Sequence, residues 1–169
     1  QHDFVRGIAS NLPALHRRLL ESYSARCNGD WPRGPDDGYF FQRLAYHLAG
    51  AGHDDDLVRL LTNSPAWLDA AFQACTGDRQ FSADIELALS TSAGQRPLGR
   101  VALLAARQIV HQRVESYTDD DLETLVHLGR AAEALSHARL RSSLPERTEA
   151  LVRIFEVTRS RADHQPELL

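Results

Sequence analysis

Apolar residues recur every three or four positions along most of the chain. The first run of this kind is formed by Leu12, Leu15, Leu19, Tyr23 and Cys27. Charged residues lie between these positions, so the spacing matches one apolar face of a helix with 3.6 residues per turn. Pro13 fits the first turn of such a helix, where proline is tolerated. The pattern predicts a helix of about four turns over residues 12–27.

A loop and a second helix are predicted next. Residues 28–38 (NGDWPRGPDDG) are rich in Gly and Pro, which indicates a loop. Beyond it, apolar residues fall at i, i+3, i+4 and i+7, namely Phe41, Leu44, Ala45 and Leu48. We expect Asp36 or Asp37 to cap this helix and Gly52 to end it in the left-handed conformation.

Three short helices with recognisable first turns should follow. Their predicted ranges are 53–62, 64–75 and 81–90. The acids at 54–56, Ser64 before Pro65, and Ser82 are each suited to a helix N-terminus. The stretch 91–97 (TSAGQRP) gathers small and turn-forming residues, so it is predicted to separate two domains.

The second half shows the same helical period. Helices are predicted over 98–114, 118–129, 130–140 and 145–157. No segment alternates convincingly with a period of two, and Ala and Leu dominate, so the chain is predicted to be all-α. Residues 44–61 and 122–140 share a helix, a Gly-ended turn and a second helix. This similarity predicts a helical bundle that continues into a short α-solenoid of antiparallel helix pairs.

Composition narrows the classes of function. The chain has 169 residues and a net charge of −4, enough for one large core or two small ones and without the basic character of a nucleic-acid-binding domain. No apolar run is long enough for a membrane span. Two cysteines give neither a disulfide framework nor a zinc motif, which favours the cytoplasm. The chain starts at Gln1 and contains no Met, so we expect it to be part of a longer polypeptide.

The stretch 34–52 (GPDDGYFFQRLAYHLAGAG) is the densest candidate site, because it combines two acids, three aromatics and a histidine. Adjacent acids such as Asp36 and Asp37 seldom point at one substrate bond, so a helix cap explains them better than acid–base catalysis. His47 is expected at a helix–helix contact. His53 and the acids after it lack a metal-binding pattern.

The aromatic residues allow two interpretations. Tyr39, Phe40 and Phe41 are expected to anchor the core and its rim, with Trp31 folded over them from the loop; the alternative is a groove for a peptide. No nucleophile motif and no phosphate-binding glycine loop is present in the sequence. The sequence therefore predicts neither catalytic nor metal-binding residues.

The first half resembles a known family. QHDFVRGIASNLPALHRRLLESY looks like the end of the winged-helix domain of NB-ARC-type STAND ATPases. PDDGYFFQRLAYHLAGAG, followed by DLVRLL, PAWLDAAF and FSADIELAL, resembles the helical domain that comes next in bacterial relatives of the apoptotic protease-activating factor. The second half is similar in composition to degenerate TPR-like repeats.

The resemblance implies a division of the chain and a nucleotide contact. It places the end of a winged-helix domain at 1–12, the helical domain at 13–92, TPR-like repeats at 98–161 and a tail at 162–169. It also implies that His2 and Asp3 sense bound ADP in a longer parent protein, whose P-loop would lie upstream. This chain would then bind no cofactor and hydrolyse nothing by itself, and ADP or ATP would belong to the parent.

The first hypothesis is a connector and sensor segment of a STAND signalling ATPase, acting through helix packing on protein partners or neighbouring domains, without nucleic acid or membrane. The residues expected to carry the packing are Leu15, Leu19, Tyr23, Phe40, Phe41, Leu44, Leu48, Trp67 and Leu68. The second hypothesis is a free-standing TPR-like peptide-binding module. The third, a small helical hydrolase or metal enzyme, has no motif in its support.

Overall fold

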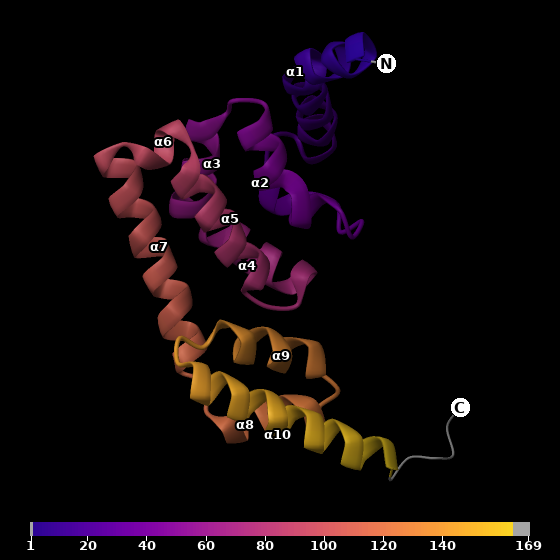
Figure 1. The fold of residues 1–169 in the computed structure, drawn as a ribbon, viewed down its shortest axis with the longest axis vertical. Coiled ribbons are helices and arrows are strands. Elements are labelled where there is room, and N and C mark those ends of the chain that lie inside the picture. Colours follow the sequence, from indigo (N-terminus) through magenta and orange to yellow (C-terminus); the bar gives the residue numbers. More distant parts are fainter. Residues whose placement is uncertain (1, 164–169) are drawn as a thin grey trace. The chain divides into compact units, whose positions relative to one another are not determined.

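The computed structural model describes the backbone of residues 2–163 and the side chains of residues 11–161. Within these residues the chain is all-α, as predicted, with ten α-helices, one short 3-10 helix and no strand (Figure 1). The elements are α1 (His2–Cys27), η1 (Trp31–Arg33), α2 (Phe40–Gly50), α3 (Asp54–Asn63), α4 (Pro65–Cys75), α5 (Arg79–Ser90), α6 (Ser92–Gln95), α7 (Pro97–Glu115), α8 (Asp119–His127), α9 (Ala131–Leu140) and α10 (Leu144–Asp163).

The chain separates into two compact units. Unit 1 comprises Gln1–Cys75 and Gln80–Arg107, and unit 2 comprises Thr76–Arg79 and Gln108–Leu169. The predicted boundary at 91–97 falls within unit 1, where Thr91 caps α6 by accepting a hydrogen bond from the N–H of Gly94. Compact packing units need not coincide with inherited domains, so the predicted domain limits stay predictions.

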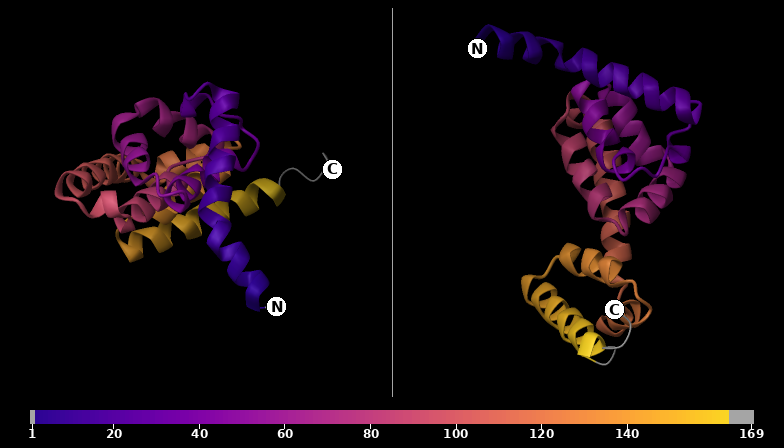
Figure 2. Two further views of the ribbon diagram at one scale, coloured as in Figure 1. Left: turned by 90° about the horizontal axis from the view of Figure 1, so that it is seen from above. Right: turned by 90° about the vertical axis from the view of Figure 1, so that its right-hand side faces the viewer.

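Unit 1 is built around α2. This helix packs against α1, α3 and α4, and α3 packs in turn against α4 and α6. Figure 2 shows α1 lying across the other helices of the unit. Burying the apolar face of α2 against three neighbours gives the unit its core.

The observed α1 corrects three expectations. It begins at His2, so Pro13 stands inside the helix and not in its first turn. Leu15 is 46% exposed and Leu12 is exposed as well. The face turned to α2 contains His16, which lies against Gly50 at the end of α2, and the buried Leu20. Leu15 lies on the same turn as His16, which contacts α2, so Leu15 is exposed because it lies on a different side of α1 from His16 and Leu20.

Side-chain caps start several helices, and one of them, at Ser64, was predicted from the sequence. Ser64 precedes Pro65 and its Oγ accepts a hydrogen bond from the N–H of Trp67 at 3.2 Å. Thr118 and Asp121 form a reciprocal capping box at the start of α8. Ser82, which was expected to cap α5, lies inside that helix, because the positive φ angles of Thr76 and Gly77 turn the chain earlier and α5 begins at Arg79.

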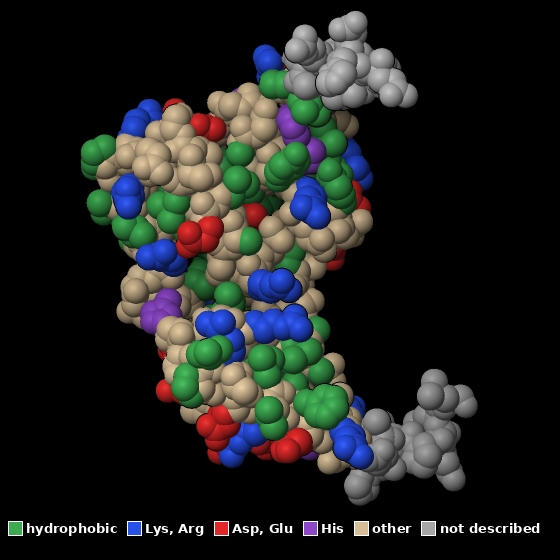
Figure 3. Space-filling view, in the orientation of Figure 1, with side chains coloured by type: hydrophobic (Ala, Val, Ile, Leu, Met, Phe, Trp, Pro, Cys, Tyr) green, Lys and Arg blue, Asp and Glu red, His purple; other side chains and the backbone are tan. Residues whose placement is uncertain are grey.

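Unit 2 is a three-helix arrangement in which α8, α9 and α10 each pack against the other two. Its apolar core is small and consists of Leu122, Leu125, Val126, Ala134, Ala138, Ala150 and Ile154. The opposite side of α10 remains apolar at Leu144, Val152 and Phe155, which are all exposed. Figure 3 shows apolar side chains gathered over the surface that α10 occupies in Figure 1.

Candidate functional site

The aromatic residues of the stretch 34–52 build a buried cluster in unit 1. The rings of Phe40 and Phe41 are perpendicular, with centroids 5.0 Å apart, and Phe41 stacks on Trp67 at 5.2 Å. Trp67 comes from α4 and is fully buried. Trp31, from η1, is half-buried and its ring lies 6.2 Å from that of Phe40. The aromatic side chains therefore fill the junction of α2, α4 and η1.

Asp37 caps this junction. Its Oδ1 accepts hydrogen bonds from the N–H groups of Tyr39 at 3.0 Å and Phe40 at 2.8 Å, and its Oδ2 accepts one from the hydroxyl of Tyr23 at 3.1 Å. The bond from Phe40, above all, lowers the pKa of the Asp37 carboxyl. Of the two adjacent acids, Asp37 is the one that caps the start of α2, whereas Asp36 is exposed.

His47 lies behind the aromatic cluster in a chain of polar contacts. Its Nδ1 is 2.7 Å from the Nδ1 of His16 on α1, and its Nε2 is 2.7 Å from the hydroxyl of Tyr39. The His47 side chain is 7% exposed. Burial, followed by the positive potential of His16 and Arg43, lowers the pKa of His47. The predicted helix–helix position of His47 is thus a hydrogen-bonded contact between α1 and α2.

The other predicted positions divide between core and surface. Leu44 and Leu48 are buried with Phe40 and Trp67, whereas Tyr39 is 43% exposed. Leu19, Tyr23 and Leu68 are half-buried. His2 and Asp3 lie at the start of α1, but their side chains are outside the residues whose side chains are described. The expected ADP-sensing role of this pair therefore stays a prediction.

A surface hollow of about 690 Å³ lies beside Trp31. Its lining includes Leu20, Glu21 and Ala25 from α1 and His53 and Asp56 from the start of α3. The lining mixes apolar and charged side chains of both signs. This hollow, together with a smaller one of about 380 Å³ that Trp31 also lines, is compatible with the interpretation of Trp31 as part of a peptide groove.

Sequence reasoning missed a buried acid on α5. Asp84 is 4% exposed, accepts a hydrogen bond from Gln80 Nε2 at 2.8 Å and leaves its Oδ2 without a hydrogen-bond partner. Burial raises its pKa to about 7. One signal was available in the sequence, because Asp84 shares the buried helical face of Phe81, Ile85 and Ala88.

A second missed feature is a buried ionic network in unit 2. Asp78 is fully buried and binds the guanidinium of Arg113, with Nε 2.8 Å from Oδ2. Glu133 accepts two hydrogen bonds from Arg130, at 2.8 and 2.9 Å. His137 is buried, stacks on Tyr117 at 4.0 Å and places its Nε2 3.9 Å from Glu133. Helical spacing places Arg130, Glu133 and His137 together along α9, but it cannot reveal the pair Asp78–Arg113, whose members come from separate elements.

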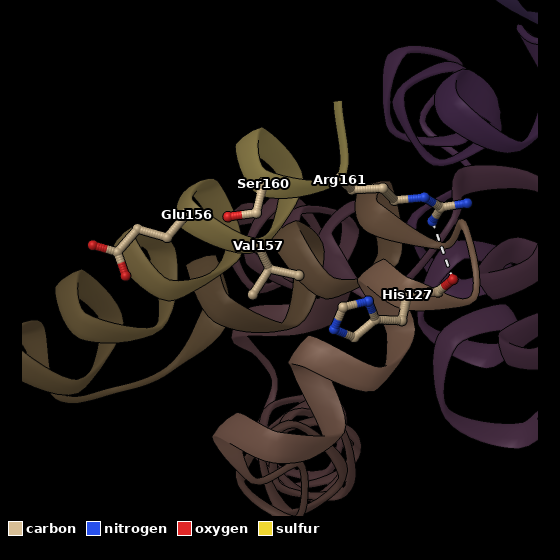
Figure 4. Close-up of a pocket in the computed structure, with 5 residues that line it drawn as sticks. All are labelled: His127, Glu156, Val157, Ser160 and Arg161. Atoms are coloured by element: carbon tan, nitrogen blue, oxygen red, sulfur yellow. Dashed lines mark hydrogen bonds between the residues drawn. The ribbon is translucent and has the colours of Figure 1, made fainter. Parts of the chain in front are cut away.

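A shallow pocket of about 370 Å³ is present on unit 2, between the end of α8 and the last turns of α10 (Figure 4). Arg161 closes one side of it and donates from Nη1 to the carbonyl oxygens of Val126 at 2.6 Å and His127 at 3.1 Å. These bonds add a side-chain donor to two carbonyl groups at the C-terminus of α8, where the Val126 oxygen also accepts the N–H of Gly129. Capping of α8 therefore accounts for the position of Arg161 beside this pocket.

The described side chains contain no grouping with an evident catalytic geometry. No three His, Cys, Asp or Glu residues among them are placed to hold a metal ion. Burial raises the pKa of Cys75 to about 11, with Asp84 and Asp36 adding to the shift, so its thiol is not activated for nucleophilic attack. Over the same part of the chain, no helix has the length and apolar character needed to cross a membrane.

Comparison with known protein families finds a match for one region of the chain. Residues 12–87 match the family model of the APAF-1 helical domain. Residues 12–87 are an APAF-1 helical domain. This domain is a non-catalytic helical segment of NB-ARC/STAND ATPases, and here it extends from α1 into α5. No curated protein and no solved structure matches the chain. The TPR-like character expected for residues 98–161 stays a prediction.

Proposed function

We propose that this chain is a connector and sensor segment of a STAND signalling ATPase, and that it couples a ligand-sensing helical array to a nucleotide-binding module. The match of residues 12–87 to the APAF-1 helical domain carries the proposal. That domain is non-catalytic, so the chain would act through packing. ADP or ATP would be bound by the parent protein, and the partners would be neighbouring domains or other proteins in the cytoplasm.

The geometry of α1 supports a mechanical route. The helix is continuous from His2 to Cys27, and a helix rises about 1.5 Å per residue. Asp3 and His16 are therefore separated by roughly 20 Å along one continuous helix. A rotation or shift of α1 at its contact with α2 would move the position at which the nucleotide is expected. In this proposal, α1 transmits the packing state of the helical domain.

The size of such coupling has a thermodynamic limit. A ligand shifts a two-state equilibrium only by the difference between its affinities for the two states. Unit 2 would supply the array that recognises the ligand, and the exposed apolar side of α10, at Leu144, Val152 and Phe155, is a surface on which further packing can occur. Stacking of helices would then carry the preference of the ligand toward the APAF-1 helical domain.

The proposal is tested by reading the gene upstream of the codon for Gln1. It predicts, in the same frame, a GxxxxGK[ST] P-loop followed by a winged-helix domain. A purified parent protein should also retain ADP, which can be released by denaturation and identified by chromatography. A frame without a P-loop would overturn the ATPase assignment.

A free-standing peptide-binding module is the second candidate. The hollow of about 690 Å³ beside Trp31 favours it, because peptide sites combine an aromatic anchor with a polar rim. Trp31 also supplies the readout. Specific peptides selected from a library should change its fluorescence and lose affinity with Trp31→Ala. Failure of every selected peptide to depend on Trp31 would remove this candidate.

A further inference from the structure

His16 and His47 form the one direct contact between two histidines found among the described side chains. Their Nδ1 atoms are 2.7 Å apart and their ring centroids 4.9 Å apart. The ring of Tyr46 lies edge-on to both, at 5.2 and 5.3 Å. His16 belongs to α1, whereas His47 and Tyr46 belong to α2. The histidine pair therefore joins the two helices directly.

The close approach of Gly50 shows that this contact is built into the packing. A Cβ atom at Gly50 would lie 2.6 Å from Cδ2 and Nε2 of His16, which is closer than van der Waals contact permits. The His16 ring thus rests on the backbone at the end of α2. The glycine leaves room for the ring at the position where it reaches the Nδ1 of His47.

The hydrogen bond between the rings limits the number of protons that the pair can hold. One Nδ1 must carry a proton and the other must offer a lone pair. A first additional proton can enter at Nε2 of His16, the less buried ring, which then donates from Nδ1 to His47. The Tyr39 hydroxyl serves His47 Nε2 in either tautomer, since a hydroxyl both donates and accepts. A second additional proton must occupy Nδ1 of His47, and two N–H groups then face each other.

The surroundings oppose that second proton. The groups that act electrostatically on His47 are His16 from α1 and Arg43 from α2, and both are basic. The rings of Tyr39 and Tyr46 adjoin His47 as well, and no carboxylate is among the groups that shift its pKa. His47 is also buried, which disfavours its charged form.

We propose that the His16–His47 pair is a proton-operated catch, which holds α1 against α2 while the rings share a proton and releases α1 when both rings are fully protonated. The catch concerns the α1–α2 contact and does not depend on the proposed ATPase role.

The direction of the pH response follows from linkage. The pKa of His47 is lowered in the folded chain from its ordinary value of 6.5. The unfolded or released form therefore binds the proton more readily. The stabilisation of the α1–α2 contact is complete above about pH 6.5 and is lost as the pH falls from there through the lowered pKa.

Nuclear magnetic resonance on the uniformly ¹⁵N-labelled full chain tests the proposal. Long-range ¹H–¹⁵N spectra report the protonation of each ring nitrogen during a titration from neutral to acidic pH. Hydrogen exchange of the α1 and α2 amides, corrected for the intrinsic pH dependence, reports release of the contact. We expect His47 to titrate below the ordinary pKa of a histidine. Protection should fall about tenfold for each pH unit by which its pKa is lowered.

Two variants distinguish release through the histidine pair from a general loss of stability at acidic pH. His16→Gln keeps a side chain that can donate to or accept from His47 but removes the second titrating ring, so the acid-induced loss of protection should largely disappear. His53→Gln changes an exposed histidine of the same unit and should behave like the wild type. An ordinary titration of His47, or an undiminished loss of protection in His16→Gln, would overturn the proposal.

Discussion

The helical hairpins α2–α3 and α8–α9 use the same turn but lie in different cores. In the first, Gly52 has a φ of 76° and the N–H of His53 bonds to the carbonyl of Leu48 at 2.9 Å. In the second, Gly129 has a φ of 80° and the N–H of Arg130 bonds to the carbonyl of Leu125 at 2.8 Å. Both are Schellman caps, so the similarity seen in the sequence is a real similarity of turn geometry.

The surrounding cores differ in chemistry. The hairpin α2–α3 belongs to an aromatic core that contains Phe40, Phe41 and Trp67. The apolar core beside α8–α9 is made of Leu, Val, Ile and Ala, and buried ion pairs such as Asp78–Arg113 accompany it. A shared turn therefore does not imply a shared source of stability. Only the aromatic hairpin lies in the region that matches the APAF-1 helical domain.

The largest effect should come from the aromatic core. Phe41→Ala should lower the free energy of unfolding of unit 1 by roughly 3–5 kcal/mol, since it removes a buried ring stacked on Trp67. Urea unfolding followed by tryptophan fluorescence measures this change, because both tryptophans belong to unit 1. Leu98→Ala, at a side chain of the same unit that is 87% exposed, is the control. A loss below about 1 kcal/mol for Phe41→Ala would place that ring outside the core.

Substitution of the buried acid Asp84 should raise the stability of unit 1, whereas Phe41→Ala lowers it. The pKa of Asp84 is raised to about 7 in the folded chain from 3.8, so folding favours its protonated form and stability falls as the pH rises from about 4 to about 7. Asp84→Asn should raise the free energy of unfolding by roughly 2–4 kcal/mol at pH 8 and give little gain at pH 4. Unfolding curves at both pH values measure it. An equal effect at the two values would show that Asp84 does not titrate between them.

Breaking the buried ion pair of unit 2 should lower the free energy of unfolding somewhat less than truncating the aromatic core of unit 1. Arg113→Gln removes the charge that faces the buried Asp78 carboxylate, whose pKa burial already raises, and should cost roughly 2–3 kcal/mol, below the full cost of breaking a buried pair, because the Arg113 side chain is 30% exposed. Unfolding of unit 2 can be followed by hydrogen exchange in α8–α10. Asp120→Asn, at a highly exposed acid of the same unit, should stay within about 0.5 kcal/mol of the wild type. Similar losses in both variants would contradict a special role for the Asp78–Arg113 pair.

Substitutions at the two shared turns should lower the free energy of unfolding by similar amounts, and by less than Phe41→Ala or Arg113→Gln. Gly52→Ala and Gly129→Ala each force an L-residue into a left-handed conformation, although neither added Cβ would meet another atom within 4 Å. Each should cost about 1 kcal/mol from backbone strain alone. Unfolding of both variants under one set of conditions compares them. Costs that differ by more than about 1 kcal/mol would mean that the two caps are not equivalent.

Features that depend on neighbouring residues in the chain were predictable from the sequence. Ser64 caps the start of α4 and Gly52 ends α2, as the local sequence predicted. Asp37 was one of the two acids expected to cap α2. The predicted buried face of α1 was wrong at Leu15, because the side of α1 that faces α2 carries His16, whose contact with His47 the sequence pattern does not reveal. The contacts of His16 and Asp78 were not predicted, since each joins residues more than 30 positions apart.

The proposed coupling is tested most directly by the rate at which the full-length protein releases a fluorescent ADP analogue. Phe41→Leu should loosen the packing of the APAF-1 helical domain without unfolding it, at a cost below about 1.5 kcal/mol. If packing of the helical domain stabilises the nucleotide-closed state of the parent protein, Phe41→Leu should release ADP several-fold faster than the wild type. Tyr46→Phe, at an exposed ring, should leave the release rate unaltered. Equal release rates for all three proteins would contradict coupling through the helical domain.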